Sequence, residues 1–218
     1  MRADAPVAYW RLGEPSGTAL LEDQGRANGT YSGGAVLGVD PAIADADRAA
    51  RFDGGNDKGV VPDTASLDFG TGDFTVEAWI KASAADERAI VAKRSSVATE
   101  PYWAVTVTDD PNHNGQIRAA YFDGATVHLA YSSATVVDSA WHHLVVWYDR
   151  DVGITISVDG LSKLTVATMA PDVGNSGPVE IAKAATHTYF KGDLDEIALY
   201  GGLLPPERVV AHRAAAGH

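Results

Sequence analysis

Apolar and polar residues alternate with a period of two along much of this chain. In residues 74–81 every second side chain lies on one face of the predicted strand, and that face carries Phe74, Val76, Ala78 and Ile80. The same period recurs at 103–107, 117–121, 141–148 and 154–158. These segments predict β-strands, each with one face against a core.

Turn dipeptides separate several of these segments. They are Asn114-Gly115, Asp123-Gly124 and Asp159-Gly160. Such pairs favour positive φ at both central positions of a type I′ turn, which joins the two strands of a hairpin. Consecutive hairpins predict an antiparallel sheet.

One segment predicts a helix. Residues 204–217 begin with prolines, continue through alanines and end near a glycine. Many short strands with glycine-rich turns and a single helix indicate an all-β fold, an antiparallel two-sheet β-sandwich (jelly roll) with a short C-terminal helix. Because no internal repeat or linker is visible, we expect residues 1–218 to form a single domain.

Composition and charge exclude some classes of function. The chain is 45% hydrophobic, which is enough for a sizeable core, and its 17 Lys and Arg against 29 Asp and Glu give a formal net charge of −12. That charge argues against a nucleic-acid partner and is compatible with divalent cations or neutral glycans. The absence of cysteine excludes disulfides, thiolate metal sites and a cysteine nucleophile.

Neither a leader nor a membrane segment is expected in this chain. The first residues lack the apolar region of a signal peptide. No apolar run approaches the roughly 20 residues that span a bilayer. We therefore expect no membrane insertion.

The most informative stretch is residues 189–200, which reads as a strand carrying Asp193, Asp195 and Glu196 within four positions. Like charges this close repel one another and destabilise a strand. Two explanations are open: the acids face water at the start of the strand, or a cation lies beside them.

Several blocks, in order along nearly the whole chain, resemble the laminin-G-like, concanavalin A-like jelly-roll superfamily, in the branch found in bacterial and phage surface proteins. They are Ala8-Tyr9-Trp10-Arg11-Leu12-Gly13-Glu14, Arg51-Phe52-Asp53-Gly54-Gly55-Asn56-Asp57, Phe74-Thr75-Val76-Glu77-Ala78-Trp79-Ile80, Trp141-His142-His143-Leu144-Val145 and Phe190-Lys191-Gly192-Asp193-Leu194-Asp195-Glu196-Ile197. The resemblance is specific for the fold and weak for function, since one fold hosts many sites.

The resemblance implies one structural Ca²⁺ where the N-terminal segment crosses the last strand. Calcium takes about six to eight oxygen ligands, mixing carboxylates with backbone carbonyls. The ligands expected here are Asp23, Asn28, Asp193 and Asp195, with Asp53 as a further source. The alternative is that Asp23 and Asn28 form Asx-turns and the acids face water.

Exposed aromatic rings and polar loops are the candidate ligand-binding features. Trp10, Trp79 and Trp141 belong to the family blocks and are predicted to be core. Trp103, beside a loop-rich region, is predicted to be a surface platform, and Tyr102 just before it is also expected to bind ligand. The expected recognition loops are 93–102, 109–115, 132–139 and 171–178, and the loop residues expected to bind ligand are Asn114 and Asn175.

Catalytic arrangements are weakly supported. His142 and His143 are adjacent and point to opposite faces of a strand, so they cannot chelate one metal as a pair. Asp193 and Asp195 crudely satisfy the carboxylate spacing of about 5–5.5 Å in retaining glycosidases. The acidic strand motif of glucanases of this fold is absent, and so are the arginine-rich and histidine-bearing strands of alginate lyases. We predict that the chain is not an enzyme.

These observations predict a non-catalytic binding or adhesion module that recognises a glycan or another surface ligand and is stabilised by Ca²⁺. An alternative from another class is a structural or decoration protein of a larger assembly, such as a phage tail or capsid. A third is a polysaccharide hydrolase or lyase. The expected location is extracellular, at a cell surface or on a virion.

Overall fold

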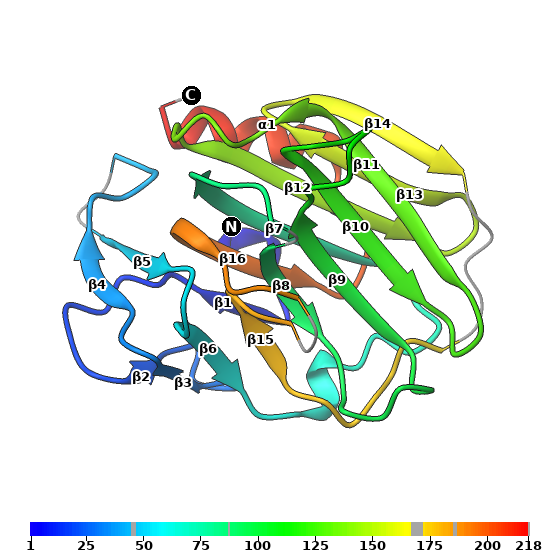
Figure 1. The fold of residues 1–218 in the computed structure, drawn as a ribbon, viewed down its shortest axis with the longest axis horizontal. Coiled ribbons are helices and arrows are strands. Elements are labelled where there is room, and N and C mark those ends of the chain that lie inside the picture. Colours follow the sequence, from blue (N-terminus) through cyan, green and yellow to red (C-terminus); the bar gives the residue numbers. More distant parts are fainter. Residues whose placement is uncertain (45–46, 87, 167–171, 185–186, 218) are drawn as a thin grey trace.

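The chain folds as a two-layered β-sandwich (Figure 1). The computed structural model describes residues 1–44, 47–86, 88–166, 172–184 and 187–217. In these residues each sheet contains eight strands, and the paired strands are antiparallel. The predicted all-β sandwich is therefore confirmed.

The first sheet, sheet A, has the strand order β14-β13-β12-β7-β16-β5-β4, and β1 also pairs with β16. Its strands are β1 (Ala8–Trp10), β4 (Val36–Val39), β5 (Ala49–Asp53), β7 (Phe74–Ala82), β12 (His142–Asp149), β13 (Gly153–Val158), β14 (Leu161–Val166) and β16 (Lys191–Tyr200).

The second sheet, sheet B, has the order β11-β10-β9-β8-β15-β6-β3-β2. Its strands are β2 (Ala19–Leu20), β3 (Gly29–Ser32), β6 (Lys58–Val61), β8 (Arg88–Lys93), β9 (Tyr102–Val107), β10 (Gln116–Phe122), β11 (Val127–Thr135) and β15 (Val179–Ile181). The helical segments are η1 (Arg2–Asp4), η2 (Ala65–Leu67) and α1 (Pro206–Ala215). Among the described residues, no helix combines the length and hydropathy needed to cross a membrane.

The core lies between the two sheets and is rich in stacked aromatic rings. Phe74 of β7 stacks on Tyr148 of β12 with 4.2 Å between ring centroids, and its ring lies 5.7 Å from that of Trp103. The face of residues 74–81 predicted to be apolar does pack into this core. Large buried aromatic surfaces dominate the stabilisation of such a core.

The hairpin turns follow the prediction in one case of three. Asp159 and Gly160 have φ of 52° and 84°, as a type I′ turn requires. At the other two dipeptides only the glycine has positive φ, so the type I′ turn is wrong there, although both dipeptides do lie between paired antiparallel strands. In the second of them, Asp123 Oδ1 accepts hydrogen bonds from the N–H groups of Ala125 and Thr126, and this closes a longer loop.

A β-bulge interrupts β16 at its acidic residues. Asp195 pairs with Trp79 and Ala198 with Glu77, so β16 has one more residue than β7 over this interval. Glu196 takes up the difference with φ of 53°. The first of the two explanations, that these acids face water, is wrong, because Asp193 is 3% exposed and Asp195 and Glu196 are each 1% exposed.

The outer face of sheet A is covered by segments from both ends of the chain. Leu204 and Val209, before and within α1, pack on Tyr9, Val145 and other side chains of the sheet. The chain just before β5 adds Ala42, which packs with Trp79 and Ala216.

A buried polar cluster lies beneath α1. The Glu77 carboxylate accepts hydrogen bonds from His143 Nε2 at 2.7 Å, Tyr200 Oη at 2.7 Å and His212 Nδ1 at 2.9 Å. His212 Nε2 lies 2.6 Å from Oδ2 of Asp4, in η1. The cluster therefore joins both ends of the chain to the centre of sheet A.

Candidate functional site

An aromatic pair is partly exposed on the outer face of sheet B. Strand alternation turns Tyr102 outward, while the next residue of β9 points into the core. The Tyr102 ring lies 5.3 Å from that of Phe122 on the neighbouring strand β10, and the Arg94 guanidinium lies over it at 4.2 Å. Two rings and a planar cation thus form one surface.

This surface borders a hollow of about 320 Å³. The hollow lies between the start of predicted loop 93–102 and the end of predicted loop 171–178, whose Pro171 is outside the described residues. It is lined by Arg94, Ser95, Ser96, Val97, Ser176, Gly177, Pro178 and Glu180. We call it the Arg94 hollow.

A buried lysine holds the two sides of the Arg94 hollow together. Lys93 Nζ donates hydrogen bonds to the carbonyls of Asn175 at 2.9 Å and Gly177 at 2.8 Å. It also forms ion pairs with Asp63 and with Asp68. A fully buried ammonium is costly unless it is paired and hydrogen-bonded, and here it is both. The 175–178 segment is therefore fixed to the end of β8.

The walls carry groups suited to reading hydroxyls. Serines can donate or accept hydrogen bonds, and a guanidinium donates several in one plane. Glu180 is held by Lys58 Nζ at 2.8 Å. Beside a partly exposed tyrosine, the hollow thus combines apolar surface with fixed polar groups, as small-molecule sites do.

The predicted ligand-binding residues do not all come together. Tyr102 borders the hollow, but Trp103 is 0% exposed and lies in the core, so its prediction as a surface platform is wrong. Asn175 is buried and anchors the hollow, since its Oδ1 accepts a hydrogen bond from the Gly177 N–H. Asn114 is exposed in the loop between β9 and β10, at the opposite end of those strands from Tyr102.

On β16, the predicted calcium ligands already have partners. Asp193 accepts hydrogen bonds from Arg51 Nε at 2.6 Å and Nη2 at 3.0 Å, and Lys81 Nζ lies 3.8 Å away. Asp195 Oδ2 accepts a hydrogen bond from the Ala42 N–H at 2.8 Å. The cations beside Asp193 in this structure are the Arg51 guanidinium and the Lys81 ammonium.

The remaining predicted ligands are engaged elsewhere. Asp23 forms an ion pair with Arg2, Asn28 Oδ1 accepts from the Glu22 N–H, and Asp53 Oδ1 accepts from the Gly55 N–H. Among the described residues, no three His, Asp or Glu side chains are grouped to hold a metal ion. These donor sets therefore do not fit a Ca²⁺ ion as they stand, and the calcium site stays a prediction.

A sequence profile decides the family. The profile of the concanavalin A-like lectin/glucanases superfamily matches residues 53–210, more than half of the chain. The chain belongs to this superfamily. No curated protein sequence matches it.

Solved structures share the superfamily fold. Domain 4 of AbnA, a GH43 extracellular arabinanase from Geobacillus stearothermophilus, in complex with arabinotriose, has a TM-score of 0.71 at 17% identity, covering 94% of this chain and 97% of that domain. The binding domain of Paraclostridial Mosquitocidal Protein 1 has a TM-score of 0.71 at 14% identity. The match covers 97% of this chain and 52% of that one.

A third example is the binding domain of botulinum neurotoxin serotype G, with a TM-score of 0.69 at 13% identity, covering 95% of this chain and 50% of that one. The chain therefore spans about half the length of these two toxin binding domains. At these identities the likeness shows the fold alone.

Two residues central to this member of the superfamily were not predicted to matter. Lys93 follows four mostly apolar residues of β8, and a lysine at the end of such a run was the available signal. Glu22 precedes the predicted ligand Asp23, and its carboxylate accepts hydrogen bonds from the N–H groups of Tyr9, Gln24 and Arg26. Nothing in the local sequence distinguishes Glu22 from its acidic neighbour.

Proposed function

We propose that this chain is a non-catalytic glycan-binding module and that the Arg94 hollow is its binding site. The observation that carries the proposal is the stacked arrangement of Arg94 over the Tyr102 ring, at the edge of a hollow lined by serines. A sugar has apolar C–H groups for the part of Tyr102 that Arg94 leaves exposed, and hydroxyls for the serines, Arg94 and Glu180.

Rigidity supports this function. Ligand sites on loops bind well when a scaffold fixes them in advance, because less conformational entropy is lost on binding. Lys93 supplies that scaffold through the two carbonyls on the far side of the hollow.

The similar structures support a binding role at a coarser level. One is a domain of an extracellular arabinanase crystallised with arabinotriose, and two are described as binding domains of toxins. By analogy with them, we infer a ligand-binding role and an extracellular location for this chain.

The hollow is poorly equipped for glycoside hydrolysis. Two carboxyl groups must flank the scissile bond, about 5–9.5 Å apart depending on the mechanism. Of the residues that line the hollow, only Glu180 is acidic, and Lys58 holds it in an ion pair. This supports a binding module over a hydrolase.

The test is calorimetry against a panel of neutral oligosaccharides, beginning with arabinotriose. We expect at least one to bind, and Tyr102→Ala to weaken that binding by about tenfold or more, which is about 1.4 kcal/mol. Tyr189→Ala is the matched control, because Tyr189 also carries a cation over its ring, Lys183 at 4.4 Å. Full binding by Tyr102→Ala, or no binding to any sugar of the panel, would contradict the proposal.

A further inference from the structure

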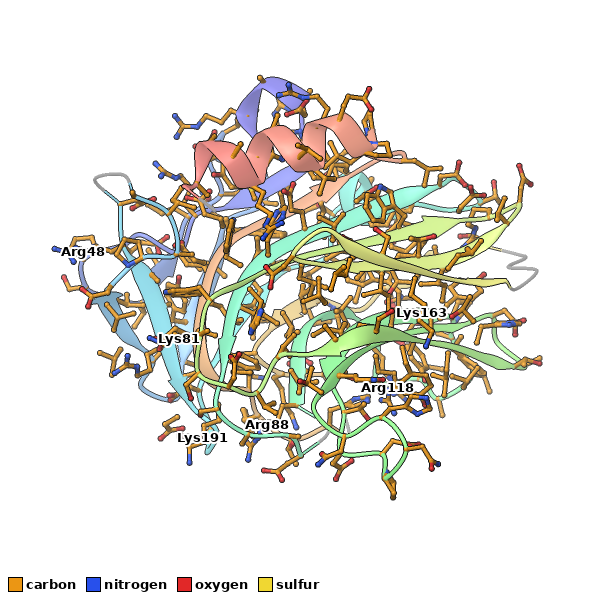
Figure 2. The ribbon with its side chains drawn as sticks, turned by 90° about the horizontal axis from the view of Figure 1, so that it is seen from above. Arg48, Lys81, Arg88, Arg118, Lys163 and Lys191 are labelled. Atoms are coloured by element: carbon orange, nitrogen blue, oxygen red, sulfur yellow. The ribbon has the colours of Figure 1, made fainter. Side chains whose placement is uncertain are left out.

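A second pocket, of about 310 Å³, lies over the outer side of sheet A. Residues from β5, β7 and β16 line it, together with Ser83 and Ser139. Three of its lining residues are cations, Arg51, Lys81 and Lys191, and we call it the cationic pocket. Lys81 and Lys191 lie near one another at one end of the sandwich in Figure 2.

The cationic pocket and the Arg94 hollow lie at opposite ends of β8. Gly54 marks the first end, since a Cβ there would lie 2.6 Å from Arg88 Nη1 and 3.0 Å from Lys191 Cβ. Arg94 follows the last residue of the same strand. From Arg88 to Arg94 the extended chain spans about 20 Å.

The cations face solvent while the buried acid lies beneath them. The Arg51 and Lys81 side chains are 55% and 34% exposed, whereas that of Asp193 is 5% exposed. Asp193 orients Arg51 through two hydrogen bonds to Nε and Nη2. Among the described residues no hydrogen bond uses Arg51 Nη1 or Lys191 Nζ, so these donors remain available to a ligand.

Such a cluster is unexpected in a chain of net charge −12. The cations outnumber the acidic lining residues, Asp53 and Asp193, and neighbouring like charges repel one another. An anion in the pocket would relieve that repulsion. It would also receive charge-assisted hydrogen bonds, which are about twice as strong as neutral ones.

Two serines, Ser83 and Ser139, also line the pocket, and their hydroxyls can hydrogen-bond a sugar that carries the anion. Ser139 is an exposed residue with φ of 64°, a conformation that a non-glycine residue rarely adopts. Its N–H donates to the Ala82 carbonyl at 3.1 Å, which holds this turn at the pocket. Trp141, predicted to be core, is only partly buried; it does not line the pocket, but its ring lies 6.0 Å from Lys81 Nζ.

We propose that the cationic pocket binds an acidic sugar unit of a glycan, through a carboxylate or sulfate held by Lys81, Lys191 and the free edge of Arg51. The site is separate from the Arg94 hollow and its proposal does not depend on that one. Its volume lies at the lower end of the range for small-ligand pockets.

The test compares an oligogalacturonide with its uncharged methyl ester by calorimetry at low salt. We expect the acid to bind at least about tenfold more tightly than the ester, and salt to weaken the binding. Titration with sodium sulfate tests whether the pocket recognises the sugar or only a free anion. Tighter binding of the oligogalacturonide than of sulfate supports the proposal, and equal affinity for sulfate overturns it.

Charge-matched variants locate the site. Lys191→Met and Lys81→Met should each weaken oligogalacturonide binding by about tenfold, the loss of one charged contact. Lys163→Met on β14 changes the net charge equally, and Figure 2 shows Lys163 well away from Lys191. It should bind as the unmodified chain does. If Lys163→Met weakened oligogalacturonide binding equally, the loss of affinity would be due to the change in net charge, and the proposal would be overturned.

The proposals for the two sites can be tested independently of each other. Tyr102→Ala should leave oligogalacturonide binding unchanged, and Lys191→Met should leave neutral-sugar binding unchanged. Loss of oligogalacturonide binding in Tyr102→Ala would place the acidic sugar in the Arg94 hollow and overturn the assignment to the cationic pocket.

Discussion

Arg51 of β5 lies directly opposite Asp193 of β16, although the two residues are 142 positions apart in the chain. They form a bidentate ion pair with two hydrogen bonds. The pair bears on one acid of the acidic strand, because the protein itself supplies a positive charge next to the buried Asp193. The carboxylate is buried and the guanidinium is half exposed.

Removing Arg51 should destabilise the fold. In Arg51→Gln the buried Asp193 loses two charge-assisted hydrogen bonds, and we expect the free energy of unfolding to fall by about 1–3 kcal/mol. Urea denaturation measures this. Arg48→Gln is the control, since the Arg48–Asp40 pair, 3.4 Å long, is exposed and should contribute little. Equal stability of the two variants would show that Asp193 does not need its partner.

Tyr102 and Trp103 should separate binding from stability. Trp103→Ala leaves a cavity beside Phe74 and should cost about 3–5 kcal/mol in the free energy of unfolding. Tyr102→Ala removes only a half-buried ring from the outer face, and it should weaken sugar binding with a much smaller loss of stability. Thermal melts of both variants measure stability, and calorimetry measures sugar binding. A melting temperature of Trp103→Ala equal to that of the unmodified chain would contradict the prediction.

Lys93 should affect both properties. Lys93→Met leaves the Asn175 and Gly177 carbonyls without a donor, and we expect a loss of about 1–3 kcal/mol. Glycan affinity should fall as well, because the 175–178 wall of the Arg94 hollow is no longer fixed. Unchanged sugar binding in a folded Lys93→Met protein would show that the wall orders itself without the lysine.

Stability should depend on pH through the Glu77 cluster. Burial opposes the charge on Glu77, but hydrogen bonds from His143 and His212 outweigh it and lower its pKa to about 2. Burial also opposes the charge on His212, but its hydrogen bond to Glu77 raises its pKa above 6.5.

The two groups set opposite limits. The contribution of Glu77 is present above its ordinary pKa of 4.5 and is lost as the pH falls toward 2, whereas that of His212 is complete below 6.5 and is lost as the pH rises through its raised pKa. We therefore expect the free energy of unfolding to be greatest between about pH 4.5 and pH 6.5, where both contributions are present. Urea melts across the pH range should show a smaller decline above pH 6.5 in His212→Gln than in His113→Gln.

The predicted calcium is checked by melting the protein in CaCl₂ and in EDTA. The resemblance predicts a lower melting temperature in EDTA, and Asp23→Asn should abolish the difference because it removes a ligand charge. Coincident melts would show that Arg2 and Arg51 serve as the counter-ions of these carboxylates.

Alternation predicted the strands because its cause is local. A strand turns successive side chains to opposite faces, so a sandwich with one core leaves a period of two in segments such as 74–81. It could not place Tyr102 and Trp103, because residues 103–107 of β9 are buried on both faces. The prediction therefore named Trp103 as a surface platform beside Tyr102, although only Tyr102 is partly exposed.

The sequence by itself determined the class of fold, the C-terminal helix and two of the loops that form the Arg94 hollow, since each follows from neighbouring residues. Tertiary structure alone decided that Arg51 is the partner of Asp193, that Lys93 anchors residues 175–178 and that three cations share one pocket. These relationships come from strand pairings and loop contacts between distant segments. No local pattern encodes them, because the free energy that selects them is gained only when both sheets close on their common core.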